Sequence, residues 1–166
     1  MKIKRVVKHL LVTEGQVKRA FPRNTLMTIE KKAIKASEAA HVGEIRFVVE
    51  GALDGLPLFK GQSARERAID LFSQLRVWDT QHNTGVLIYL LLADRAVEIV
   101  ADRGIHEKVG SQDWNKICQQ METAFRQSSY ESGVVSGLQA VMQHLVQHFP
   151  AGGHNGNELP DKPVVL

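Results

Sequence analysis

The sequence of 166 residues contains a single cysteine, Cys118, which excludes an internal disulfide bond. It has no apolar run long enough to span a bilayer and no apolar signal-type segment near its start, so we expect a soluble cytoplasmic protein. Zinc-finger spacing and aromatic-interleaved basic stripes are also missing, and a net charge of +3 alone does not indicate nucleic-acid binding. There is no Gly-rich phosphate loop, nucleophile elbow or Cys-x-x-Cys motif.

What is present suits one globular domain, because 43% of the residues are hydrophobic and the length is enough to bury a sizeable core. We divide the chain into a basic N-terminal segment (1–20), a domain (21–150) and a flexible C-terminal tail (151–166). Pro150 and the Gly-rich stretch after it mark the second boundary.

The N-terminal segment is strongly basic. Apolar residues are interleaved with its cations, so a short amphipathic helix is expected, with a stripe formed by Val6, Val7, Leu10 and Leu11. One interpretation is docking to an anionic lipid surface or an acidic partner. The other, which we favour from sequence alone, is a solvated helix that packs its apolar residues on the domain.

Two strands are expected in the middle of the chain. Gly85–Ala93 is almost continuously apolar and predicts a strand buried on both faces, whereas the more mixed Ala96–Asp102 predicts an antiparallel return strand near the sheet edge. With Asp94-Arg95 as the turn, Leu87 is expected opposite Asp102.

Several other segments have clear patterns. Glu44–Glu50 reads as a strand, residues 51–62 as a loop, and residues 64–75 as a helix with Ala68, Ile69, Phe72 and Leu75 on its inner face. Further helices are expected after a cap at Asn24 or Thr25, after Ser111, and from about Glu131. This order predicts a three-layer α/β/α sandwich around a small mixed β-sheet, with a parallel crossover between the first two strands.

Polar residues gather at both ends of the predicted sheet. The carboxyl ends of the parallel strands carry Glu50, Asp54, Asp94 and Arg95. The opposite end collects Glu38, His41, Glu44, Asp79, His82, Asn83, Asp102, Arg103, His106 and Glu107 from three separate loops. Oxygen ligands of this kind suit a hard cation such as Ca²⁺. The alternative is a polar sheet end that only caps helices and pairs with Arg103, and the residues alone favour that alternative.

Two weaker signals have simpler explanations. His144 and His148 have the spacing of a metal pair, but they lie off the apolar stripe of their helix and suit a helix C-terminus. Cys118 shares a face with Trp114 and Met121, which favours a buried packing thiol over a nucleophile.

The motifs Gly43–Val49, Asn83–Ile88, Asp94-Arg95 and Gly104–Glu107, together with Glu38 and the later run Phe125–Tyr130, resemble the TPM domain family. The resemblance covers about Phe21 to Pro150, and is to a short bacterial branch often encoded beside LemA-type membrane proteins. It implies an α/β/α sandwich and divalent-cation binding, calcium most often. It also implies an acid phosphatase assignment for plant members.

Three hypotheses follow. In the first, a divalent cation held by Glu38, Asp79, Asn83 and Asp102, or a protein partner there, lets the domain modulate a membrane-associated, LemA-like complex. In the second, the cation positions a phosphomonoester, with His82 or His106 as general acid and Arg103 on the phosphate oxygens. The third is a structural adaptor docked through residues 1–20.

Overall fold

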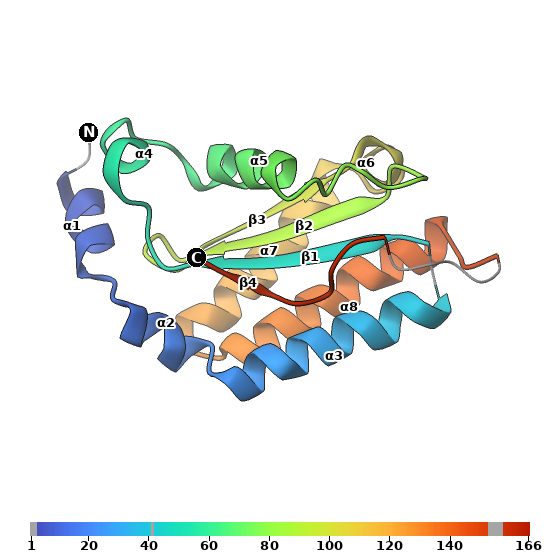
Figure 1. The fold of residues 1–166 in the computed structure, drawn as a ribbon, viewed down its shortest axis with the longest axis horizontal. Coiled ribbons are helices and arrows are strands. Elements are labelled where there is room, and N and C mark those ends of the chain that lie inside the picture. Colours follow the sequence, from blue (N-terminus) through green and yellow to red (C-terminus); the bar gives the residue numbers. More distant parts are fainter. Residues whose placement is uncertain (1–2, 41, 153–157) are drawn as a thin grey trace.

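A four-stranded mixed sheet, with strand order β3-β2-β1-β4, forms the centre of the computed structural model (Figure 1). The structure describes residues 3–40, 42–152 and 158–166, with side chains omitted for residues 33–40. The strands are β1 (Glu44–Glu50), β2 (Gly85–Leu91), β3 (Ala96–Ala101) and β4 (Val164–Val165). β2 pairs parallel with β1 and antiparallel with β3, as predicted, and β3 is an edge strand. β4, which the sequence reading did not predict, pairs parallel with β1.

The register of the β2–β3 hairpin differs from the prediction. Leu87 pairs with Val100 instead of Asp102, because the turn occupies four residues from Leu92 to Arg95 and not two. Arg95 closes the turn at a φ of 52°, and its N–H donates to the carbonyl of Leu92. The shift is two residues, so each side chain keeps the sheet face that the sequence assigned to it.

Helices cover both faces of the sheet, which confirms the α/β/α sandwich (Figure 1). α5 (Ala64–Gln74) lies on one face, and α3 (Arg23–Ala40), α7 (Ser111–Arg126) and α8 (Tyr130–His148) form the layer on the other. Each interface has its own core. Val48, Leu87 and Tyr89 pack toward α5, whereas Phe47, Ile88 and Leu90 pack toward α7 and α8. β2 is therefore buried on both sides, as its apolar run predicted.

Four shorter helices complete the chain: α1 (Ile3–Leu11), α2 (Glu14–Ala20), α4 (Gly55–Phe59) and α6 (Arg103–Val109). The N-terminal segment thus holds two helices, because Thr13 forms a capping box with Gln16 and starts α2. The predicted loop 51–62 contains α4, and the predicted polar loop after Ala101 is α6, with Asp102 as its N-cap. The three helices that were not predicted, α2, α4 and α6, have only five or seven residues, which is too short for periodicity to reveal.

Two predicted caps are wrong. α3 already begins at Arg23, so Thr25 lies in its first turn, and the Thr25 hydroxyl donates to Glu131 at 2.6 Å. Ser111 is the first residue of α7 and follows Gly110, whose φ of 83° sets the bend before the helix. Ser63 does start α5, with a capping box to Glu66.

The inner face of α5 differs from the prediction at Ile69. Ala64, Ala68 and Leu71 face the sheet, while Ile69 is exposed.

The C-terminal residues return to the sheet. Leu159 is buried in the core on the α5 side, and the guanidinium of Arg46 donates to the carbonyls of Pro160 and Lys162. Beyond them, β4 continues beside β1, and the N–H of Gly51 donates to the carbonyl of Leu166 at 3.1 Å. None of the helices in the described residues is long and apolar enough to cross a membrane.

Candidate functional sites at the two ends of the sheet

The loops that the sequence assigned to one end of the sheet do meet there. The N–H of Ile105 donates to the carbonyl of Asn83 at 3.3 Å, and the Thr84 hydroxyl donates to the carbonyl of Val42 at 3.2 Å. Gly104 packs against the backbone of His82 and Asn83 so closely that a Cβ there would lie 2.6 Å from the Asn83 oxygen. Asn83 itself has a φ of 52°. Loops 79–84 and 102–107 therefore share one surface.

Asp102 is a predicted metal ligand whose carboxylate keeps one oxygen unpaired in the part of the chain that the structure describes. Its Oδ1 accepts from the N–H of Arg103 at 2.7 Å and caps α6. Its Oδ2 is buried and has no hydrogen-bond partner among the described residues. An unpaired buried carboxylate oxygen is costly, and a cation would satisfy it. Asp102 thus fits the divalent cation that the family resemblance implies.

The remaining predicted site residues are less closely gathered. Asp79 is exposed and pairs with Arg76 at 2.9 Å, so its carboxylate is already engaged. His82 and Arg103 are exposed and His106 is half-buried, and among the described residues no hydrogen bond or ion pair joins these three side chains. The side chain of Glu38 and all of His41 lie outside the described residues. Within the described residues, no three His, Cys, Asp or Glu side chains form a group that could hold a metal. The cation site and the catalytic roles stay predictions.

The structure adds Glu158 to this end, which the site prediction did not include. Its N–H donates to Oε1 of Glu44 at 3.0 Å, and its own carboxylate accepts from the N–H of Gln81 at 3.0 Å. Burial is the main reason that the pKa of Glu44 rises to about 7, and the charges of Asp161 and Glu158 add to it. Only the path of the C-terminal residues reveals this contact.

At the opposite, carboxyl end of β1 and β2, polar side chains form two satisfied networks. In the first, the Tyr89 hydroxyl donates to Glu50 at 2.6 Å, and Arg67 binds both carboxylate oxygens of Glu50 at 2.8 and 2.9 Å. Burial, and then the hydrogen bond to Glu50, raise the pKa of Tyr89. With every group paired, this network stabilises the fold and offers no free chemistry.

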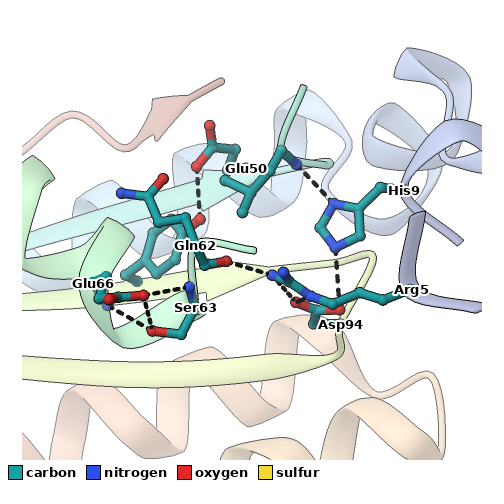
Figure 2. A network of polar contacts seen from close by, with 9 residues as sticks. Arg5, His9, Glu50, Gln62, Ser63, Glu66 and Asp94 are labelled. Carbon is teal, nitrogen blue, oxygen red and sulfur yellow. Dashed lines mark hydrogen bonds and ion pairs between the residues drawn. The ribbon is translucent and has the colours of Figure 1, made fainter. Parts of the chain in front are cut away.

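The second network fastens α1 to the domain (Figure 2). Arg5 donates to Oδ2 of Asp94 at 2.8 and 2.9 Å and to the carbonyl of Gln62 at 2.8 Å. His9, buried beside it, lies 3.1 Å from Oδ1 of Asp94 and accepts from the N–H of Leu53. Burial alone would raise the pKa of Asp94, but the hydrogen bonds with Arg5 and His9 outweigh it and lower that pKa.

Because Arg5 and His9 point inward, α1 is turned the opposite way from the favoured prediction. Val6 is half-buried, but the rest of the predicted stripe faces solvent, with Val7, Leu10 and Leu11 47%, 70% and 66% exposed. Ile3, on the same side of α1, is 73% exposed. On α4, Leu56 and Phe59 are 70% and 57% exposed. Leu10 and Phe59 line one cavity of about 340 Å³, so the exposed apolar residues of the two helices adjoin there. We call these six residues the α1–α4 face.

The weaker sequence signals have structural explanations. Cys118 lies on the core-facing side of α7, and burial raises the pKa of its thiol to about 12, as expected for a packing residue. The rings of His144 and His148 stack 6.5 Å apart, and Trp114 meets His144 edge-on. Burial is the main cause that lowers the pKa of His144. Nearby Asp113 acts in the opposite direction and His148 adds to the lowering.

A mixed sheet between helical layers, with polar loops at both strand ends, defines a small α/β/α domain. A family model described as the TPM domain matches residues 20–144, which is most of the chain. The chain belongs to the TPM domain family.

Solved structures of other proteins share this fold. The BA42 protein from the psychrophilic bacterium Bizionia argentinensis is 26% identical, with a TM-score of 0.72 over 86% of this chain and 93% of that chain. The N-terminal domain of a P. gingivalis protein is 20% identical, with a TM-score of 0.61 over 81% of this chain and 82% of that one, and supports the fold alone. A search of curated proteins found no match.

Proposed function

We propose that this TPM domain is a binding module that works at a membrane, and that it docks on an anionic lipid surface through the α1–α4 face. The observation that carries the proposal is the orientation of α1, which leaves Ile3, Leu10 and Leu11 in solvent. A helix whose only role was to pack on the domain would bury these residues, because each buried leucine stabilises the folded state by about 1.5–3 kcal/mol.

The charges around the face suit an anionic bilayer. Lys4 and Lys8 lie on α1 beside the apolar stripe, and Lys60 ends α4; all three are exposed. An amphipathic helix with an apolar side and flanking lysines lies in the membrane interface, where each cation adds about 1 kcal/mol of attraction. Arg5 and His9 hold the helix in place from the other side, so the apolar residues are presented without any rearrangement.

Vesicle co-sedimentation tests the docking. We expect the protein to pellet with vesicles of phosphatidylcholine and phosphatidylglycerol, and far less with phosphatidylcholine alone. The variant Ile3→Ser/Leu10→Ser should lose at least about tenfold in affinity. Ile69→Ser/Val146→Ser, which removes two exposed apolar residues from α5 and α8, is the matched control and should bind like the wild type. No binding by the wild type, or equal loss in both variants, would overturn the proposal and turn the search to a LemA-like protein partner.

We further propose that the module is linked to a divalent cation at the Asp102 end of the sheet. Asp102 Oδ2 would contribute the carboxylate, with the Asn83 amide and loop carbonyls as further oxygen ligands. A Ca²⁺ titration followed by amide NMR should give saturable shifts confined to residues 79–84 and 102–107, and Asp102→Asn should abolish them. If the amide shifts of the wild type did not change with Ca²⁺, the proposed link to a divalent cation would be wrong. If the wild type hydrolysed a phosphomonoester and Asp102→Asn did not, the phosphatase alternative would be favoured.

A further inference from the structure

A further cleft of the described residues lies away from the Asp102 end and borders the α1–α4 face at Leu11. It has a volume of about 750 Å³ and runs between the α1–α2 segment, the β2–β3 turn and the turn that joins α7 to α8. Leu92 and Ala93, which directly follow β2, form part of its wall. The cleft therefore lies at the carboxyl end of the central parallel strands, where open α/β sheets usually bind ligands, and its volume is within the range of small-molecule sites.

Three cations line this cleft without partners. Lys8 comes from α1, Arg19 from α2 and Arg95 from the β2–β3 turn, so residues far apart in the sequence meet in this cleft. None of the three makes an ion pair or side-chain hydrogen bond with any described residue. The one carboxylate in the lining, Asp94, is already bound by Arg5 and His9.

Neutral groups add to the polar lining. Ser128, from the turn between α7 and α8, and Tyr130, the first residue of α8, bring two hydroxyls to the cleft, and Gln16 of α2 brings an amide. The Tyr130 ring is held in place by stacking against Phe125 at 5.4 Å and by its contact with Phe21. Planar guanidinium groups with hydroxyl donors nearby are the groups that bind phosphate oxygens in proteins.

We infer that this cleft, lined by Lys8, Arg19 and Arg95, binds a phosphate-bearing ligand. A phosphomonoester carries a charge of about −1.5 to −2 at neutral pH, which suits three cations and one already paired carboxylate better than a monocarboxylate does. This inference concerns a ligand site, not the apolar docking surface. The ligand is a free phosphate compound or a lipid headgroup, because both present the same phosphate chemistry to the cleft.

Amide NMR titrations without vesicles test the inference, with inorganic phosphate and the short-chain monomeric lipid dihexanoyl phosphatidate as separate probes. We expect saturable shifts at residues 92–95 and 128–130. The variant Arg19→Gln/Arg95→Gln should weaken binding at least about tenfold. Lys31→Gln/Lys32→Gln, which removes the same charge from exposed positions on α3, should bind like the wild type.

Saturation by both probes would assign the site to phosphate itself, and saturation by phosphatidate alone would assign it to a lipid headgroup. No saturable shift with either probe, or equal weakening in both double variants, would overturn the inference. Ile3→Ser/Leu10→Ser should keep the shifts, because neither residue lines the cleft. This result separates a failure of the cleft from a failure of membrane docking.

Discussion

The backbone N–H of Leu53 donates a 2.9 Å hydrogen bond to Nδ1 of His9, inside the domain. Because Nδ1 accepts this bond, the ring proton belongs on Nε2, which then donates to Asp94 at 3.1 Å. A neutral imidazole thus joins α1 to the loop after β1 and to the turn after β2. This latch fixes which side of α1 faces solvent, and the proposed docking surface depends on it.

Removing the imidazole should therefore free α1. In His9→Leu the Leu53 N–H stays buried without an acceptor, which costs about 1–3 kcal/mol. We expect hydrogen exchange of the α1 amides to accelerate and the urea midpoint to fall. His148→Leu, at the end of α8, is the control and should leave α1 exchange unchanged. Wild-type exchange rates for α1 in His9→Leu would show that the latch does not hold the helix.

Glu44 should make stability depend on pH. Its pKa is raised from 4.5 to about 7, so the folded state binds the proton more tightly than the unfolded state does. The resulting stabilisation is complete below pH 4.5 and is lost as the pH rises through about 7. Glu44→Gln keeps an acceptor for the Glu158 N–H without the charge. Urea unfolding above pH 7 should find it more stable than wild type, by up to about 3 kcal/mol.

Glu107→Gln, an exposed site on α6, serves as the charge control for this prediction. It should leave the pH dependence in place. A Glu44→Gln protein that is less stable than wild type above pH 7 would show that the buried carboxylate is better paired than its burial indicates.

Two substitutions in the Glu50 network should differ in how much they lower the free energy of unfolding. Arg67→Met leaves a buried carboxylate without its cation and should cost about 3–5 kcal/mol. Tyr89→Phe removes one donor while Arg67 remains, and should cost about 1.5–3 kcal/mol. Arg126→Met, which breaks an exposed pair with Glu122, should cost at most about 1 kcal/mol. Urea denaturation of the three variants gives the order, and a reversal of the first two would contradict this assignment.

Gly104 should be intolerant of a side chain. The Cβ of Gly104→Ala would lie 2.6 and 2.7 Å from the carbonyl oxygens of Asn83 and His82, so the two loops must separate. We expect a loss of about 1–3 kcal/mol and amide shifts throughout residues 79–84. Gly15→Ala in α2 meets nothing closer than 3.7 Å and should stabilise by about 0.5–1 kcal/mol. Unchanged shifts in loop 79–84 would show that the contact is not tight.

The long periodic segments were predictable because their patterns depend on local spacing. β1, β2, α5, α7 and α8 all lie close to the predicted ranges. β4 was not, because a strand of two residues has no pattern and is held by its pairing with β1 and by Arg46. Periodicity likewise shows that α1 is amphipathic but not which side faces the domain. Its partner Asp94 lies 85 residues beyond His9.

The same limit applies to the candidate sites. Topology predicts that loops 79–84 and 102–107 meet, and they do. It does not predict the side-chain partners: Asp79 pairs locally with Arg76, and Glu44 is met by Glu158 from the C-terminal residues. The cleft lined by Lys8, Arg19 and Arg95 was missed because its cations come from three elements with no shared spacing.

The most direct measurement of the central claim is paramagnetic broadening of amide signals by spin-labelled lipid in small anionic bicelles. We expect the strongest broadening at residues 3–11 and 55–60, while the amide signals of α7 and α8 remain sharp. Uniform broadening, or broadening centred on α7 and α8, would contradict docking through the α1–α4 face.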